Sequence, residues 1–268
     1  VRITESIIKA GISELADSRI ENIKKIKGAG IKSKFMLLRP PSYEKLKDNI
    51  DLVDEILISE IETLQKTVNF CEEDGHDLDF IYMIDLGDLR EGVWYENAVE
   101  EISYALSVDD GRIVGIGTNL GCYGGVVYTK EKMIELVEIK RKIEKKTSRK
   151  LTKISGGSTA ALQLLYRDEL PAEINNFRIG EAILLGTDTT NDVEIERLNK
   201  DTMFFCAEII ELKEKPTVPV GKIGKDAFGR DPVFEDRGIR KKAILDVGEQ
   251  DIFPSGLKPT DKNIKILH

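Results

Sequence analysis

The sequence predicts a parallel α/β protein: a (β/α)8 barrel of the TIM type that lacks its first strand, followed by a smaller, mostly-β domain. Over roughly the first 200 residues, short apolar runs alternate with helical patterns, which is typical of strands joined by crossover helices. The runs are continuous rather than alternating in polarity, as expected of strands buried on both faces. Helical periodicity then ends, so we expect a barrel domain at residues 1–200 and a β-rich domain at 201–268.

The expected elements follow one another without long gaps. A helical pattern with Thr4 as a candidate cap opens the chain, and Ser59 with Glu62 forms a candidate capping box. Because the chain opens on a helix, we expect the first barrel strand to lie upstream of Val1 and the β domain to be incomplete. Strands are expected at 11–19, 34–38, 53–58, 79–84, 112–117, 151–154, 174–178, 202–213, 242–247 and 263–267, and helices at 20–27, 43–49, 59–74, 95–107, 130–146 and from Ala160.

Composition narrows the function classes. The net charge is -8 and the pI is near 5.1, and no basic tract is free of acidic residues, so neither a nucleic acid nor an anionic membrane is an expected partner. No apolar run approaches the roughly 18 residues of a membrane span, and no signal-peptide pattern is present, so we expect a cytoplasmic protein. Three cysteines without metal spacing and two isolated histidines argue against a disulfide framework, a zinc site and Ser/His/Asp chemistry.

Two backbone-rich turns follow predicted strands, at residues 155–159 (SGGST) and 178–181 (RIGE). The glycines of the first turn would let the main chain approach a ligand, and Ser158 and Thr159 can cap the helix expected to follow. N–H groups and hydroxyls would then point at one spot that suits a phosphate. A plain strand-to-helix turn with a Ser/Thr cap is the alternative for the first turn. In a parallel barrel both turns would lie at the C-terminal ends of the strands, where barrels carry their sites.

Four motifs carry a family resemblance: SGGSTAAL, NNFRIGEAILLG, MIDLGDLREG and GIGTNLGCYGG. In a barrel followed by a β domain, they resemble the amino-acid racemases of the alanine racemase type (fold type III), which depend on pyridoxal 5'-phosphate (PLP). The likeness is closest to the branch that includes ornithine racemase. It implies PLP as the cofactor, with the cofactor-binding residues at the two turns, namely Ser155, Ser158, Thr159, Arg178, Gly180 and Glu181.

Within this resemblance, Arg178 falls beside the pyridine nitrogen of the cofactor. A guanidinium cannot give up its proton, so the ring nitrogen that it contacts stays unprotonated and the cofactor is a weaker electron sink. Such a cofactor favours return of a proton to the α-carbon over transamination. A salt bridge at the barrel rim is the alternative for Arg178.

Three residues are implied on the catalytic side. Arg90, in the loop after the strand that ends at Ile84, is expected to contact the cofactor or the substrate carboxylate. The alternative is a surface arginine paired with a neighbouring acid, Asp88 or Glu91. Cys122 and Tyr123 lie in the next loop, where Tyr123 could donate a proton or simply pack as a lid.

The chain departs from the family at two positions. The family's Schiff-base lysine stands at the end of the first barrel strand, and no residue of this chain matches it, so we expect that lysine in a segment upstream. Without it, one face of the substrate has no base. The second base of the family is a tyrosine from the β domain of the partner subunit. Where it would fall, this chain has Pro219 and Val220, which leaves Cys122, Tyr123 and Asp226 as candidates.

These features predict a PLP-dependent isomerase that interconverts the L- and D-forms of a free amino acid by two-base transfer of the α-proton. The ornithine racemase likeness favours a basic amino acid, and an acidic rim of Asp85, Asp88 and Glu91 would suit its second ammonium group. Ser18 and Arg19, at a strand end, are further candidates for the site. The family implies a homodimer with sites completed across the interface. Two alternatives stay open: a non-catalytic PLP-binding homeostasis protein, and a barrel that binds another phosphorylated metabolite.

Overall fold

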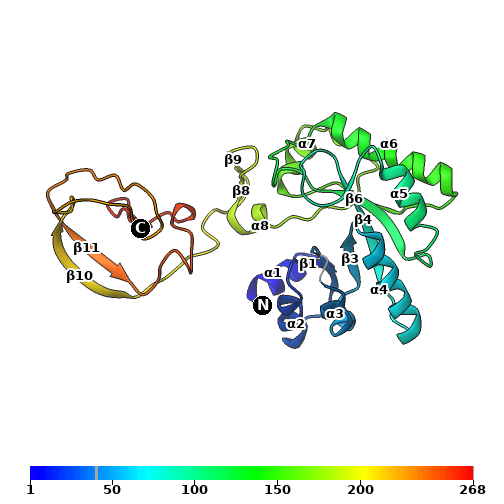
Figure 1. Cartoon of the computed structure of the whole chain (residues 1–268), viewed down its shortest axis with the longest axis horizontal. Helices are drawn as coiled ribbons and strands as arrows, with labels where there is room; N and C mark the ends of the chain where they lie inside the picture. The colour runs from blue at the N-terminus through cyan, green and yellow to red at the C-terminus, as the bar shows by residue number, and fades with distance from the viewer. Residues whose placement is uncertain (40–41, 268) are drawn as a thin grey trace. The chain divides into compact units, whose positions relative to one another are not determined.

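The computed structural model describes residues 1–39 and 42–267, and the chain divides into two compact units between Thr202 and Met203 (Figure 1). The first unit is built on a parallel sheet in which neighbouring strands follow the order of the chain, as expected of strand-helix-strand units. The strands along the sheet are β1 (Glu14–Asp17), β2 (Lys34–Leu37), β3 (Glu55–Ile58), β4 (Asp79–Asp85), β6 (Ile113–Thr118) and β7 (Lys153–Ser155), and the short β5 (Val93–Trp94) pairs with β4.

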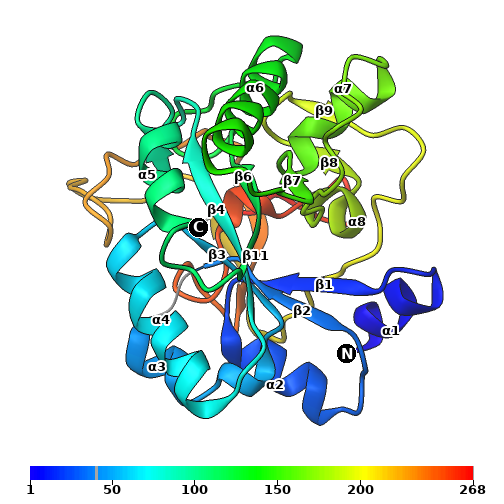
Figure 2. The same cartoon turned by 90° about the vertical axis from the view of Figure 1, so that its right-hand side faces the viewer.

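Helices cover the outer face of this curved sheet (Figure 2). Outward side chains of the strands, such as Phe35 and Phe80, share one buried cluster with Ile23 and Leu64 of the helices. None of the helices in the described part of the chain is both long enough and apolar enough to cross a membrane.

The elements besides the main strands are α1 (Arg2–Lys9), α2 (Ile20–Gly28), α3 (Tyr43–Lys47), η1 (Ile50–Leu52), α4 (Ile61–Asp74), α5 (Ala98–Ala105), α6 (Lys130–Thr147), η2 (Thr159–Ala161), α7 (Leu162–Tyr166), α8 (Glu181–Leu185) and the hairpin of β8 (Thr187–Asp188) and β9 (Val193–Glu194).

The inner face of the sheet has its own apolar cluster, formed by Met36, Leu57, Ile81 and Met83. Inner and outer residues alternate along each strand because side chains of a strand point to opposite faces in turn. Gly117 of β6 faces this cluster, and a Cβ there would lie 3.1 Å from the Met83 Sδ. Burial on both faces therefore explains the continuous apolar runs in the sequence.

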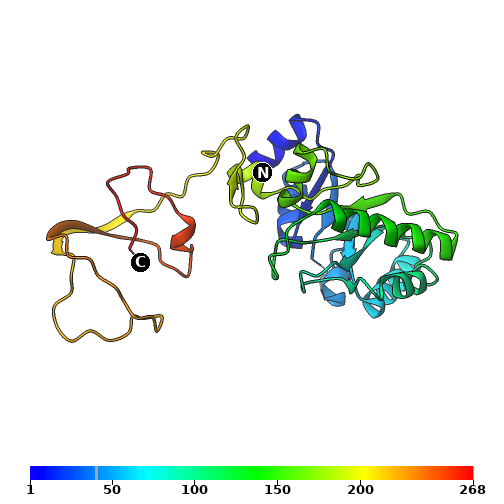
Figure 3. The same cartoon turned by 90° about the horizontal axis from the view of Figure 1, so that it is seen from above.

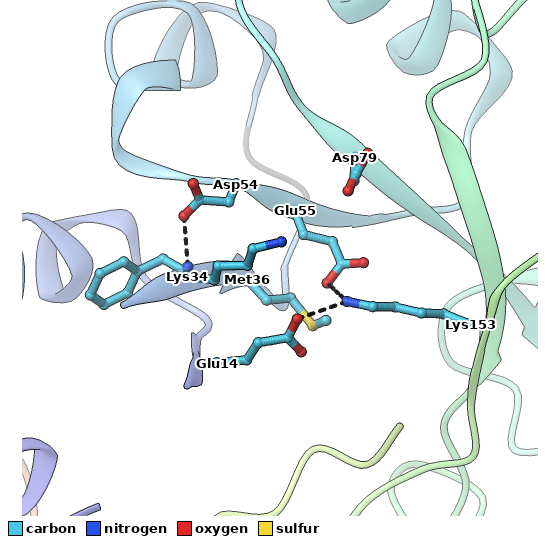
Figure 4. A pocket seen from close by; sticks show the side chains of 8 residues that line it. Glu14, Lys34, Met36, Asp54, Glu55, Asp79 and Lys153 are labelled. Carbon is cyan, nitrogen blue, oxygen red and sulfur yellow. Dashed lines mark hydrogen bonds and ion pairs between the residues drawn. The ribbon is translucent and has the colours of Figure 1, made fainter. Parts of the chain in front are cut away.

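A layer of charged residues lies at the start of the strands, and we call it the charged floor (Figure 4). It consists of Glu14, Lys34, Glu55, Asp79 and Lys153, each the first residue of its strand, around a cavity of about 20 Å³. The Lys153 Nζ lies 3.0 Å from the Glu14 Oε1 and 2.9 Å from the Glu55 Oε2. Because β1 and β7 stand at opposite ends of the sheet, this ion pair shows that the sheet curves back on itself as a partial barrel.

The expected strand at residues 174–178 is wrong. This segment makes a single parallel bridge, between Ser155 and Asn176, so the sheet is open within the described residues. The side chain of Asn175 supplies the reason, because its Oδ1 accepts a hydrogen bond of 2.9 Å from the Ile154 N–H of β7. Backbone bonds also join the two segments, from the Gly156 N–H to the Asn176 carbonyl at 2.9 Å and from the Asn176 N–H to the Ile154 carbonyl at 3.2 Å. The segment thus pairs with β7 at one point, and the Asn175 side chain takes the place of a further backbone bond.

Two expected helix caps are also corrected. Helix α1 begins before Thr4, which lies in its first turn and is buried. Helix α4 has Glu60 as its N-cap residue and no side-chain cap bond, so Ser59 and Glu62 do not form the capping box. The helix starts one residue later than the motif requires, and Glu62 instead pairs with Lys66 at 2.7 Å.

The second unit contains an antiparallel hairpin of β10 (Ile209–Pro216) and β11 (Ile239–Leu245), with a bulge near Ile209, and one short helix, η3 (Pro254–Gly256) (Figure 3). The strand expected at 202–213 begins later, and that expected at 242–247 begins earlier. The strand expected at 263–267 is wrong, because no regular structure forms there. A two-stranded hairpin offers few neighbours, so strand-like sequence in this unit lacks partners to pair with.

Candidate active site

The two turns at 155–159 and 178–181 lie against each other, as the sequence predicts. The Arg178 N–H donates to the Gly157 carbonyl at 2.9 Å, and the Ala182 N–H donates to the Thr159 Oγ1 at 3.2 Å. The first turn follows β7 directly, so both turns stand at the C-terminal end of this strand. The sequence prediction that they converge at one end of the strands is therefore confirmed.

Arg178 is held by groups from two strand ends. Its Nη2 donates to the Thr118 carbonyl at 2.7 Å, and its Nη1 donates to the Ser155 Oγ. The Ser155 hydroxyl in turn donates to the Asn176 Oδ1 at 2.6 Å. Burial lowers the pKa of the Arg178 guanidinium from its ordinary value, although an arginine stays protonated in proteins. Among the described residues Arg178 has no ion pair, so the rim salt bridge that was its alternative does not form.

The glycines of the two turns have different surroundings. A Cβ on Gly156 would lie 2.2 Å from the Ile174 Cγ2, and one on Gly157 would lie 2.3 Å from the Tyr128 Cε1. These two glycines therefore make room for protein side chains rather than for a ligand, which corrects the expectation from sequence. Gly180 differs, since a Cβ there would meet nothing within 4 Å beyond its own chain neighbours.

The hydroxyl and carboxylate groups of the turns are also used differently from expectation. Ser158 precedes η2 but makes no side-chain cap bond, and the Thr159 hydroxyl accepts from α8 rather than capping its own helix. The Glu181 carboxylate accepts hydrogen bonds from the hydroxyls of Thr187 and Thr189 at 2.7 and 2.6 Å. In the described structure, the N–H groups of Gly180 and Glu181 donate to no protein acceptor, as is usual at the start of a helix.

Tyr128 is a site residue that sequence reasoning missed. Its hydroxyl accepts hydrogen bonds from the Leu120 N–H at 2.9 Å and the Ser158 N–H at 3.3 Å, and its ring covers Gly157. It is 4% exposed. Tyr128 thus joins the loop after β6 to the first turn, and the only sequence signal was an aromatic residue between a glycine-rich loop and the helix cap Thr129.

The loop after β4 is fixed by two buried carboxylates. The Asp85 Oδ1 accepts from the Gly87 N–H at 2.8 Å and from the Leu89 N–H at 3.2 Å. The fully buried Asp88 accepts from backbone N–H groups of the loop after β6, including that of Tyr123 at 2.8 Å. Both carboxylates are committed to the backbone, so neither belongs to the acidic rim expected for a substrate ammonium group.

Arg90 and Glu91 follow in the same loop. The Arg90 Nε lies 3.0 Å from the Glu91 Oε2, while no ion pair with Asp88 forms. Of the two pairings weighed from sequence, the one with Glu91 is therefore present. Both residues lie close enough to Arg178 to act on the pKa of its guanidinium, which brings the two predicted arginines into one site.

The remaining candidates are less enclosed. Tyr123 is 77% exposed and Cys122 is also exposed. Ser18 and Arg19 line an open cavity at the ends of β1 and β2, whose lining includes no residue of the two turns. Asp226, in the second unit, is ion-paired with Arg230 at 2.8 Å, and the bonds from Arg230 lower the pKa of its carboxyl.

The residues at this rim fit a PLP-like cofactor. Gly180 offers open space beside free N–H groups for a phosphate, and the buried Thr118 Oγ1 next to Arg178 has no hydrogen-bond partner in the described residues. Lys153 does not fit as an amine for covalent attachment, because its ion pairs with Glu14 and Glu55 raise its pKa. Within residues 1–39 and 42–267, no group of three or more His, Cys, Asp or Glu side chains could hold a metal ion.

The first unit is a partial parallel barrel whose rim, at the C-terminal ends of the strands, suits an anion. This places the chain in the class of α/β-barrel proteins that bind a ligand at that rim. Residues 1–188 match the family model of the alanine racemase N-terminal domain, and the chain belongs to this family. It is 49% identical over 267 residues to the lysine racemase of Thermotoga maritima, which covers 100% of this chain and 75% of the relative. It is 38% identical over 266 residues to the ornithine racemase of Acetoanaerobium sticklandii, covering 99% and 75%.

Solved structures agree on the fold. An alanine racemase of Clostridium difficile 630 superposes with a TM-score of 0.62 at 18% identity, over 91% of this chain and 61% of that one. A D-threo-3-hydroxyaspartate dehydratase of Delftia sp. HT23 gives a TM-score of 0.58 at 16% identity, over 71% and 52%. The chain thus spans less than two thirds of these structures. The sequence resemblance to the racemase family is confirmed, although of these two relatives the lysine racemase is more similar than the ornithine racemase.

Proposed function

We propose that the protein is a PLP-dependent racemase that interconverts the L- and D-forms of a basic amino acid, lysine or ornithine. The observation that carries this proposal is the joining of the two turns around Arg178, which Ser155 and Thr118 hold at the strand ends. The names and similarity of the two relatives support the reaction and the substrate class.

The second turn supplies donors for the cofactor phosphate. The N–H groups of Gly180 and Glu181 begin α8, where the partial positive charge of a helix start favours an anion. The hydroxyl hydrogens of Ser158 and Thr159 are the donors from the first turn. The Thr159 oxygen accepts from the Ala182 N–H, which leaves the hydroxyl hydrogen to be donated to a ligand.

Arg178 sets the electronic character of the site. When bound, the cofactor would withdraw electrons from the α-carbon and so make its proton removable. Arg178, fixed by two strand ends, would keep a ring nitrogen unprotonated because a guanidinium does not release its proton. Arg90 would bind the substrate carboxylate. Cys122 and Tyr123 are the candidates for a proton donor at this rim, and the site would be completed in a homodimer.

The test is racemisation by the full-length protein. We expect optical rotation to decay from pure L-lysine or L-ornithine, together with a visible absorption band that borohydride removes. A band without decay for any amino acid would contradict the proposal and favour a non-catalytic PLP-binding protein. Absence of both would favour a different phosphorylated ligand at the same turns.

A further inference from the structure

One carboxylate in the loop after β4 is not committed to the backbone. Asp85 and Asp88 each accept hydrogen bonds from two or more backbone N–H groups. Glu91, in the same loop, accepts none in the described structure. It is the member of the expected acidic rim whose carboxylate is left for another partner.

The pairing of Glu91 is incomplete. Its Oε2 lies 3.0 Å from the Arg90 Nε, but the pair lacks hydrogen-bond geometry, and this buried oxygen has no hydrogen-bond partner in the described residues. The Glu91 side chain as a whole is 25% exposed, so it can be approached from solvent, and Arg90 is the cation that lies beside its Oε2. A carboxylate oxygen that is shielded from water and not hydrogen-bonded is unfavourable, and a ligand with N–H donors would relieve this.

The loop presents Glu91 from a fixed backbone. A Cβ on Gly92 would lie 2.5 Å from the Asp85 backbone N, and Gly92 has φ +122°. Leu89 has φ 57° and donates to Asp85. Glycine packing on one side of Glu91 and the Asp85 bonds on the other leave the loop little freedom, so the carboxylate is preorganised.

Glu91 is the carboxylate that lies near both arginines of the site. Arg90 and Arg178 are close enough to influence each other, and Glu91 is the acid that acts on both. A substrate carboxylate bound by Arg90 would draw this arginine from Glu91. The carboxylate of Glu91 would then lose its ion-pair partner, and a second positive group on the substrate could take that place.

We propose that Glu91 is the specificity residue that binds the side-chain ammonium of a basic amino-acid substrate, which rests on the proposed racemase function. An ammonium has three donors and can satisfy the Glu91 Oε2 that Arg90 does not. An uncharged side chain of the same length would leave this oxygen unsatisfied. Selection of lysine or ornithine over aliphatic amino acids follows from this difference.

The experiment compares lysine with norleucine, which has the same carbon chain and no side-chain ammonium, in the full-length protein. We expect the ratio of kcat/KM for lysine over norleucine to fall about 10- to 100-fold in Glu91→Gln, the range for loss of a charged hydrogen bond. Glu91→Asp keeps the charge and should retain part of the ratio. Glu62→Gln, at a carboxylate with 74% side-chain exposure, is the matched control and should leave the ratio unchanged.

A binding measurement separates this inference from the proposed function. Trp94 is the single tryptophan of the chain and pairs with Asp85 at the base of the same loop, so its fluorescence can report binding without turnover. Weaker lysine binding in Glu91→Gln with unchanged norleucine binding supports the role of Glu91, whether or not racemisation occurs. An unchanged lysine-to-norleucine ratio in both measurements overturns it, and failure of the wild-type protein to racemise any amino acid overturns the proposed function alone.

Discussion

The two ends of the sheet both carry charged and polar residues, but they use them in opposite ways. At the charged floor, Lys153 forms ion pairs with Glu14 and Glu55 around a cavity of about 20 Å³. These ion pairs hold the strands together. At the other end, Asp85 and Asp88 hold loops by accepting from their N–H groups, the Glu91 Oε2 has no hydrogen-bond partner in the described residues, and the Cβ direction of Gly180 is open. The Glu55 Oε1 of the charged floor also has no hydrogen-bond partner among the described residues, so the two ends differ in what their carboxylates bind, strands at one end and loop N–H groups at the other.

The sharpest test of the binding end is Arg178→Ala. We expect kcat for racemisation to fall on the order of 10²- to 10³-fold, as when a preorganised electrostatic donor is removed, with an altered absorption spectrum of the bound cofactor. Steady-state kinetics and spectra of the full-length protein measure both. Arg141→Ala, which removes a solvent-exposed arginine paired with Glu173, should leave them unchanged. Equal racemisation by Arg178→Ala would mean that this arginine does not contact the cofactor.

The corresponding test of the charged floor is Lys153→Met. We expect the free energy of unfolding to fall by about 2 to 4 kcal/mol, because Glu55 would remain buried without its partner. The value is placed below the full range for buried pairs since the Lys153 side chain is 26% exposed. Urea unfolding measures it. Adding Glu55→Gln to this variant should recover part of the loss, and no recovery would show that the pair is not the cause.

Within the binding end, two glycines are expected to have different roles: Gly157 makes room for a protein side chain, and Gly180 leaves room for the cofactor. Gly157→Ala should destabilise the fold by about 1 to 3 kcal/mol, because its Cβ would strike the Tyr128 ring and its φ is +121°. Gly180→Ala should leave the unfolding free energy nearly unchanged, since its Cβ direction is open, but should weaken PLP binding. Thermal unfolding and cofactor titration distinguish them. A stable Gly157→Ala would contradict the packing described for Tyr128.

The smallest effect concerns pH. Burial raises the pKa of the Glu55 carboxyl above its ordinary value near 4.5, so the folded protein holds a proton that the unfolded chain releases. This contribution to stability is present below the unfolded pKa and is lost as pH rises through the folded pKa. The unfolding free energy of the wild type relative to Glu55→Gln should therefore decline from pH 4.5 upward, by less than about 1.4 kcal/mol per pH unit. A difference that is flat or rises with pH would contradict the direction of the shift.

The sequence by itself determined the alternation of strands and helices, the two turns and the family. Continuous apolar runs predict strands that are buried on both faces, and the glycine-bearing turns after such strands predicted where two loops meet at the strand ends. These signals depend only on residues that are close together in the sequence, so they can be interpreted without knowing the tertiary structure. The same logic failed at residues 174–178 and 263–267, where strand-like patterns form no regular strand: the first makes a single bridge to Ser155, beside which the Asn175 side chain bonds to β7.

Only the tertiary structure decided which polar groups were already satisfied. In the sequence, Asp85, Asp88 and Glu91 form one acidic run, but the fold gives the first two to backbone N–H groups and leaves the third without such bonds. Tyr128 and the charged floor were likewise invisible, because their partners come from distant strands and loops. Hydrogen-bond satisfaction depends on groups that folding brings together, so no local pattern can report it.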